Sequence, residues 1–293
     1  MSLVINHNLM AMNASRSLNI SYGRLATSVQ RLSSGLRINS AQDDAAGLAV
    51  REMMRTDIAV LDQGVRNAND AISMIQTADG ALSVIDEKLT RMKELAEQAA
   101  TGTYTTSQRA IMDSEYQAMA SEITRIANAT DFNGVKLLDG SLSGSGVDGT
   151  SGNQMKIHFG TGNSSAEDYY YVKIGTATAS ALGVGNSAAE GAGWTISTQS
   201  AAQESLDAIN SAINTKDNMR ANLGALANRL ANTVSVLGIQ AQNLQAAESA
   251  ISDVDVATEM TEFTRNQVLV QAGVAMLAQA NSLPALALRL MGG

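Results

Sequence analysis

Two features of this sequence have residue types and spacing that could support chemistry on a small molecule or a metal. Residues 144–149 read GSGVDG and match the GxGxxG pattern of phosphate-binding loops, but that pattern binds phosphate only between a strand and a helix. The flanking sequence predicts neither element, so we interpret this segment as a loop. The two histidines, His7 and His158, lie far apart and outside any zinc-binding spacing such as HExxH.

Two pairs of neighbouring carboxylates are the remaining candidates, Asp43 with Asp44 and Asp253 with Asp255. Each pair precedes a segment with helical periodicity, where a carboxylate caps the helix N-terminus. No general base or nucleophile pattern accompanies them. The sequence therefore predicts no catalytic residue, no metal site, no cofactor and no enzyme activity.

Composition narrows the class of protein further. The 293 residues contain 45% hydrophobic residues but only 3% aromatic ones, a single proline and no cysteine, which is typical of a helical chain with a thin core. The net charge of −8 argues against nucleic-acid binding by phosphate neutralisation. Polar residues interrupt the most apolar stretch, residues 268–291, so no membrane insertion is expected. The N-terminus resembles no cleaved signal peptide.

Three helices are predicted in the N-terminal half. The first carries a stripe with alternating spacings of four and three, formed by Ala11, Ser15, Leu18, Tyr22, Leu25, Val29, Leu32 and Leu36. A second helix follows the polar stretch 33–40 and bears a similar stripe over residues 58–99. Its length should be on the order of 80 Å at 1.5 Å per residue. A third, over residues 107–129, is expected to fold back on it.

Two more helices are predicted at the C-terminal end. The first has a stripe from Leu206 to Ile251, on which Lys216, Arg220 and Glu248 also fall; such charges are expected to mark weak layers or helix ends. The stripe of the last helix is formed by Met260, Phe263, Val270, Val274 and Leu277. A neighbouring face carries Leu269, Gly273, Met276 and Ala280, so this helix is expected to be covered from two sides.

The middle of the chain is rich in glycine, serine and threonine. Asn133 and Gly134 predict a turn, and alternating apolar residues around Ile157 and Val172 predict a strand pair joined through residues 161–168. The predicted fold class is mainly α: a long antiparallel helical bundle or coiled coil formed by the N- and C-terminal segments, with a small central β-hairpin region.

Several blocks of the sequence resemble bacterial flagellins, in the order of that family. They are Asn6, Asn8 and Leu9, LSSGLRIN at 32–39 with AQDDAAG at 41–47, AISMIQTADG at 71–80, FNGVKLL at 132–138, LGALANRL at 223–230, and residues 253–260 with Gln279, Ala280, Asn281 and Pro284. Only residues 140–193 lack the resemblance, as in a short flagellin with a reduced variable region. The last five residues extend beyond the usual leucine-rich end of the family.

The resemblance implies a structural subunit that polymerises with itself into the hollow flagellar filament for motility. It implies export in unfolded form by the type III apparatus, hence a secreted, extracellular location. Residues 1–43 with 255–293 would form the inner tube, 44–139 with 194–254 the outer tube, and 140–193 a variable insert with a β-hairpin. Implied partners are other copies, an export chaperone at the C-terminal helix, and the filament cap and hook-junction proteins.

The resemblance also implies recognition by a host innate receptor of the Toll-like type. The family's receptor-contact positions correspond to Arg91, Leu95, Gln98 and Glu115. Because Leu95 lies off the helix stripe, we expect it to be exposed and able to anchor a partner. Packing within the filament is an equally good explanation of these residues.

Three alternatives remain open. The hook-filament junction protein shares the terminal helical pattern and is the closest structural rival, although FNGVKLL and the C-terminal blocks favour flagellin. A type III membrane translocator should show an apolar hairpin. A filament protein carrying a protease insert should show a zinc motif. Neither feature occurs in this sequence.

Overall fold

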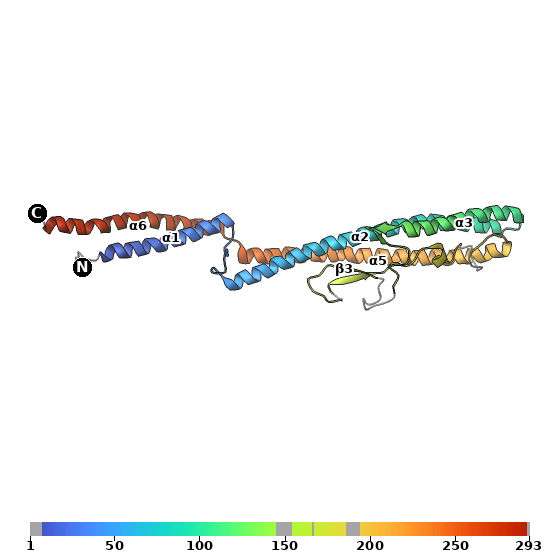
Figure 1. Ribbon diagram of the computed structural model, residues 1–293, viewed down its shortest axis with the longest axis horizontal. Coiled ribbons are helices and arrows are strands. Elements are labelled where there is room, and N and C mark those ends of the chain that lie inside the picture. Colours follow the sequence, from blue (N-terminus) through green and yellow to red (C-terminus); the bar gives the residue numbers. More distant parts are fainter. Residues whose placement is uncertain (1–7, 145–153, 166, 186–193, 292–293) are drawn as a thin grey trace. The chain divides into compact units, whose positions relative to one another are not determined.

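The protein is described by a computed structural model that covers residues 8–144, 154–165, 167–185 and 194–291, with side chains through residue 282. Helices dominate this part of the chain (Figure 1), and the predicted fold class is confirmed. The elements are α1 (Leu9–Ser34), α2 (Ala45–Ala100), α3 (Thr106–Ala129), β1 (Asp131–Phe132), β2 (Val135–Lys136), β3 (Met155–His158), β4 (Tyr169–Val172), α4 (Ala179–Leu182), α5 (Gln199–Ser252) and α6 (Val256–Met291).

The chain divides into two compact units. We call Met1–Ile58 with Gln242–Gly293 the terminal unit, and Ala59–Ala241 the central unit. The long helices α2 and α5 contribute residues to both. The predicted assignment of segments to inner and outer tubes concerns the filament, and it stays a prediction.

The central unit contains a contiguous apolar core. All the buried residues of this core lie between Ala68 and Leu230, where α2, α3 and α5 pack together. The helix α3 folds back on α2 as predicted, and the Arg109 side chain donates hydrogen bonds to the carbonyls of Ala99 and Thr101 at the turn. At its N-terminus, Thr105 and Gln108 form a reciprocal capping box that satisfies unpaired backbone N–H groups.

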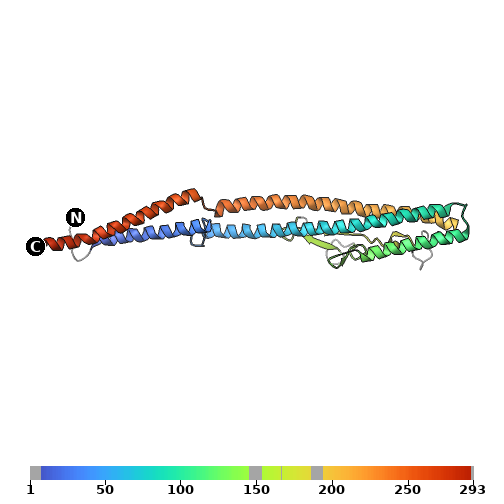
Figure 2. The ribbon, with the colours of Figure 1, turned by 90° about the horizontal axis from the view of Figure 1, so that it is seen from above.

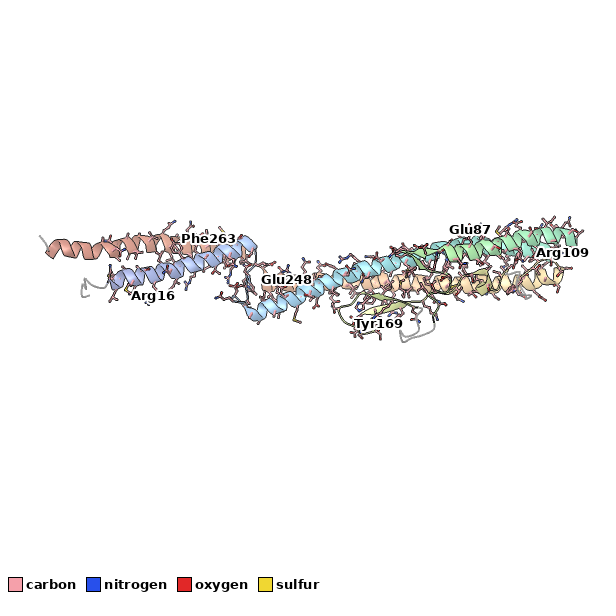
Figure 3. The ribbon with its side chains drawn as sticks, viewed as in Figure 1. Arg16, Glu87, Arg109, Tyr169, Glu248 and Phe263 are labelled. Carbon is pink, nitrogen blue, oxygen red and sulfur yellow. The ribbon has the colours of Figure 1, made fainter. Side chains whose placement is uncertain are left out.

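Two hairpins decorate the helices of the central unit. β1 and β2 pair across the turn predicted at Asn133 and Gly134, where both residues have positive φ angles (52° and 81°), as a tight hairpin turn requires. β3 and β4 pair antiparallel, with His158 opposite Tyr169 and with Tyr169 on the hairpin in Figure 3. This is the strand pair expected from the alternating pattern.

The β3–β4 hairpin is fixed to α2. The Asn67 side chain donates a hydrogen bond of 2.8 Å to the carbonyl of His158, and the backbone of Phe159 lies directly against Gly64. A Cβ atom at position 64 would overlap that backbone. Gly64 therefore permits the close contact between helix and hairpin.

In the terminal unit α1 packs against α6, and the views in Figures 1 and 2 show these two helices side by side. Asn8 caps α1 by accepting the backbone N–H of Ala11, and the same side chain donates to the carbonyl of Ala280 on α6. At the other end of α1, Gly35 adopts a left-handed conformation (φ 72°) and donates to the carbonyl of Arg31. The helix thus ends where the polar stretch was predicted to interrupt it.

Candidate assembly surface

On α1, leucines at every seventh position form the contact with α6. Leu18, Leu25 and Leu32 are half-buried, whereas Val270 on α6 is buried and Phe263 and Leu277 are half-buried. Leu18 lies against Gly273, whose missing side chain lets the helices approach closely. Figure 3 labels Phe263 on α6 and Arg16 on α1.

Four residues of the predicted stripes lie outside this contact. Tyr22 and Val29 on α1, and Met260 and Val274 on α6, are 46–49% exposed. The helix packed against each stripe within the chain does not cover these positions, and the role of the stripes as polymerisation seams stays a prediction. Residues three positions from the leucines, such as the buried Ser28, face α6 instead.

Leu36 was also predicted on the α1 stripe, but it lies beyond the end of the helix. It forms an isolated antiparallel bridge with Asp253. The backbone N–H of Arg37 donates to the carbonyl of Ser252 at 2.7 Å, and that of Val254 donates to the carbonyl of Gly35 at 3.0 Å. The linker after α1 is therefore joined by backbone hydrogen bonds to the linker between α5 and α6.

Carboxylates organise the starts of α2 and α6. The backbone N–H groups of Ala46 and Gly47 donate to Asp44, and Asp255 accepts from Ala257 and Thr258. The Thr258 hydroxyl and backbone bonds lower the pKa of Asp255 below its ordinary value. Capping was therefore the correct interpretation of Asp44 and Asp255. It was wrong for Asp253, which follows α5 and accepts from the Ser249 hydroxyl at 2.6 Å.

Asp43 holds the linker before α2 rather than the helix itself. Hydrogen bonds from the backbone of Ser40 and Asn39 lower the pKa of its carboxyl group. Arg51 reaches the same linker from α2: its guanidinium donates to the carbonyl of Ile38 at 2.7 Å and pairs with Glu52. The linker is thus an ordered segment of the terminal unit.

The faces of α1 and α6 that point away from their mutual contact are apolar and open. Met276 is 61% exposed and Met12 is 59% exposed. Among the residues whose side chains the structure describes, the large apolar ones exposed on these two helices are Leu9, Met10, Met12, Ile20, Tyr22, Val29, Val256, Met260, Val268, Leu269, Val274 and Met276. We call these residues the open apolar faces. Leu269 and Met276 were expected to belong to a second covered side of α6, and no described residue of this chain covers them.

Two shallow grooves lie along the open apolar faces. One runs beside α1, between Met12, Ile20 and Leu277, and the other runs along α6, between Met260, Val268 and Leu269. Monomeric soluble proteins seldom expose apolar surfaces of this extent, and such surfaces typically mark protein contacts. Two buried side-chain atoms in the described part of the chain lack a hydrogen-bond partner, Arg31 Nε and Ser252 Oγ, and both belong to this unit.

The residues assigned to receptor contact are brought together on α2 and α3, with one exception. The Arg91 guanidinium pairs with Glu115 at 2.8 Å and with Glu94 at 3.0 Å, and Gln98 donates to the hydroxyl of Tyr104. Arg91 and Gln98 are exposed, and the side chain of Glu115 is 43% exposed. Leu95, however, is only 2% exposed and belongs to the core, so the expectation of an exposed anchor was wrong. The fold-back of α3 covers a face of α2 that the stripe alone leaves open.

Two of the three charges predicted to weaken the α5 stripe, Lys216 and Arg220, are paired instead. α5 continues unbroken through Lys216, Arg220 and Glu248, so none of them marks a helix end. The Lys216 ammonium, whose side chain is 2% exposed, contacts Asp86 on α2 at 2.5 Å and Asp217 at 2.7 Å. Burial opposes its charge, but the hydrogen bonds to Asp217 and Asp86 outweigh burial and raise its pKa.

No candidate for small-molecule or metal chemistry emerges from the described ranges. They hold no cluster of His, Cys, Asp or Glu side chains suited to a metal ion. Most of the GxGxxG segment and all of His7 lie outside those ranges, whereas His158 stacks on Tyr169 in the hairpin. Of the helices that the structure describes, none has the length and apolar character to cross a membrane.

The chain matches two protein-family models. Residues 5–143 match the bacterial flagellin N-terminal helical region, and residues 206–291 match the bacterial flagellin C-terminal helical region. The intervening residues 144–205 include all but the first four residues of the predicted variable insert (140–193), and the assignment of that insert stays a prediction.

Known flagellar proteins resemble this chain over nearly its full length. The chain is 43% identical over 289 residues to the flagellin of Halalkalibacterium halodurans, covering 99% of this chain and 100% of that protein. It is 41% identical over 280 residues to flagellin FlaB1 of Treponema pallidum, with 96% of each covered. It is 40% identical over 289 residues to the flagellar filament core protein flaB2 of Brachyspira hyodysenteriae, with 99% and 100% covered.

A solved structure also resembles this chain in its fold. A Vibrio parahaemolyticus protein described as flagellar hook-associated matches with a TM-score of 0.55, at 15% identity, over 72% of this chain and 100% of that chain. At that identity the likeness concerns the fold alone.

Proposed function

Because this chain belongs to the bacterial flagellin family, whose members are structural filament proteins and not enzymes, we propose that the open apolar faces of α1 and α6 polymerise it into the flagellar filament. Each subunit docks these faces against copies of the same chain. The family supports the structural role, and the exposed residues support the assignment of the contact.

One observation carries this proposal, the contrast between the two units. The central unit encloses a contiguous core of buried residues, whereas large apolar residues along α1 and α6 remain exposed. Ordering a residue costs roughly 1–2 kcal/mol of backbone entropy, and burial of apolar area is the main term that offsets it. Two helices that cover each other along one narrow face bury little area, so neighbouring subunits must supply the rest.

The same reasoning supports export of the chain in unfolded form. A sequence without cysteine cannot form disulfides in transit, and terminal segments with weak internal cohesion order late. We propose that a type III apparatus exports the subunit, that an export chaperone covers α6 beforehand, and that cap and hook-junction proteins meet it at the growing end outside the cell.

Seeded growth tests the polymerisation. Purified subunits mixed with sheared filament fragments should form long hollow fibres in electron micrographs. Deletion of residues 269–293 should abolish growth, while circular dichroism shows a folded central unit. Elongation by the truncated chain at the normal rate would contradict the proposed role of α6.

A pair of single substitutions makes this test sharper. Met276→Ser places a polar group on an open apolar face and should slow elongation strongly, whereas Ile111→Ser, at a still more exposed site (72% against 61%) on α3 of the central unit, should leave elongation nearly unchanged. Equal effects of the two substitutions would show that these faces have no special part in growth.

The hook-filament junction protein remains the alternative within the same architecture. The hook-associated neighbour shares the fold only, whereas the relatives at 40–43% identity are flagellins and a filament core protein. Immunogold labelling along the flagellum separates the two: a junction protein labels one short zone, and a filament subunit labels the whole length.

We further propose recognition by a host receptor of the Toll-like type through Arg91, Gln98 and Glu115. Their support is the exposed ion pair that joins α2 to α3, a fixed pattern of charge that a partner could read. Arg91→Ala should lower receptor activation at least severalfold, with Arg55→Ala, a similarly exposed arginine of α2, as the control. Unchanged potency of Arg91→Ala would end this proposal. Leu95 is unsuitable for such a test because it is a core residue.

A further inference from the structure

Four charged residues form two ion pairs between α2 and α5 inside the central unit. Lys216 pairs with Asp86 at 2.5 Å, and Arg220 pairs with Asp79 at 2.7 Å. The lower-numbered partner on α2 meets the higher-numbered one on α5, because the two helices run antiparallel. Only the Lys216 side chain is buried (2% exposed), whereas those of Asp86, Asp79 and Arg220 are 35–43% exposed at the edge of the contact.

We propose that these two ion pairs set the register of α2 against α5, so that the helices cannot lock together one heptad out of place. Register is a real problem for this chain, because an apolar stripe that repeats every seven residues looks the same after a slip of seven. The inference does not depend on the proposed polymerisation.

The need for two pairs follows from the spacing along α2. Asp79 and Asp86 are seven residues apart, and Ile72 and Lys93 occupy the next positions of the same frame. If α5 carried only one of the two basic residues, a slip of seven residues would be tolerated, because the other aspartate of α2 would replace the one that moved away. With both basic residues on α5, no slip satisfies both.

In the first slip Asp79 takes the place of Asp86 opposite Lys216. Arg220 then faces the apolar Ile72, and Asp86 takes the exposed place of Lys93. This register therefore keeps one ion pair between the helices where the native register has two, because the pair of Arg220 with Asp79 is lost.

In the opposite slip Asp86 takes the place of Asp79 opposite Arg220. Lys93 then takes the place of Asp86 opposite Lys216, which sets two ammonium groups together in a site where Lys216 is 2% exposed. Like charges at close range inside a protein repel strongly, so this register is excluded as well.

Replacing Asp86 and replacing Asp79 should therefore have different effects on the register, and this difference makes the inference testable. Replacing Asp86 by Asn leaves the buried ammonium of Lys216 without its α2 carboxylate in the native register, whereas the slipped register still offers Asp79 to Lys216. Replacing Asp79 by Asn removes an equal charge one heptad away, but it leaves the Lys216–Asp86 pair intact and makes neither slip favourable.

The experiment measures register directly during refolding. Because the chain has no cysteine, spin labels can be placed at Thr90→Cys on α2 and Asn232→Cys on α5, both exposed. Labelled chains are unfolded in denaturant, diluted, frozen shortly afterwards and analysed by pulsed electron spin resonance. The first slip lengthens the label separation by about 10 Å, since seven residues rise 1.5 Å each.

The labelled parent chain and Asp79→Asn should each give a single, native separation. Asp86→Asn should give a second population about 10 Å longer, severalfold above any trace in the other two. Moving the carboxylates by a full heptad, with Ile72→Asp and Asp86→Ile, should enlarge that population further. A single native separation in both Asp86 variants, or equal second populations in Asp79→Asn and Asp86→Asn, would overturn the inference even if stability falls.

Discussion

The burial of the Leu95 side chain decides whether a substitution there tests receptor binding or the stability of the fold. Its side chain is 2% exposed and belongs to the core of the central unit, whereas Ile111 on α3 is 72% exposed. Both are large and aliphatic, and both lie in the region assigned to receptor contact or close to it. The residue that resembles an anchor in the sequence is therefore a structural one.

Leu95→Ala should lower the free energy of unfolding by about 3 kcal/mol, because it leaves a cavity in a packed layer. The matched Ile111→Ala should change it by less than about 0.5 kcal/mol, as expected for an exposed site. Denaturant unfolding followed by circular dichroism checks both values. Similar losses for the two variants would mean that α3 does not cover Leu95 in solution.

Asp168 supplies a second prediction at the residue scale. The backbone N–H groups of Ser164 and Gly162 donate to its carboxylate at 2.7 Å and 3.1 Å, and they lower its pKa below the ordinary 3.8. The fold thus favours the charged form. The resulting stability of the loop between β3 and β4 is complete above the ordinary pKa and is lost as the pH falls through the lower pKa of the folded state.

Nuclear magnetic resonance should show the amide signals of Gly162 and Ser164 shifting together with a midpoint below pH 3.8. In Asp168→Asn the same transition should be absent and the loop looser at neutral pH. A midpoint at or above the ordinary value would show that these bonds do not form.

At the scale of elements, Gly64 and Gly80 of α2 distinguish two effects of replacing glycine by alanine: overlap with a neighbouring segment and stabilisation of the helix itself. A Cβ added at Gly64 would lie 2.1 Å from the backbone oxygen of Phe159, whereas one added at Gly80 meets nothing within 4 Å. Both are interior positions of one helix, where alanine is intrinsically the better residue.

Gly80→Ala should therefore stabilise the protein by up to about 1 kcal/mol. Gly64→Ala should destabilise it and release the β3–β4 hairpin from α2, seen as faster exchange of the hairpin amides. The two variants are compared by denaturant unfolding. Stabilisation by Gly64→Ala would show that the hairpin is not held against the helix.

At the scale of the whole chain, the two units should differ in local stability. The terminal unit leaves large apolar residues of α1 and α6 exposed, and the central unit has a contiguous core. Local opening costs little where few apolar contacts are lost. Subunits that assemble through such a unit should order it only on docking.

Hydrogen exchange of dilute subunits should thus show fast exchange over residues 3–39 and 258–293, and slow exchange over the buried stretches of α2, α3 and α5. Both terminal segments should become protected in seeded filaments. Protection of these segments in the dilute subunit would contradict assembly-coupled ordering.

Much of the fold and part of the candidate site could be predicted from the sequence. The linker at 33–40, the caps Asp44 and Asp255, the turn at Asn133 and Gly134, and the strand pair are set by neighbouring residues, so local patterns reveal them. Leu18, Leu25 and Leu32 lie on one face of α1, because every seventh residue of a helix returns to the same face, and all three are half-buried. Their role as a polymerisation seam stays a prediction.

The sequence by itself determined the helices, their ends, the turns and the absence of recognisable catalytic patterns, since these follow from residues close together in the chain. Only the tertiary structure decided that Ser28 faces α6 while Val29 is exposed, that α3 buries Leu95, and that Lys216 meets Asp86. The leucines of α1 do not by themselves decide whether the residues three or four positions away complete the contact with α6. A charged residue on a stripe can likewise mark a helix end or form an ion pair. The partner helix, distant in sequence, makes each of those choices.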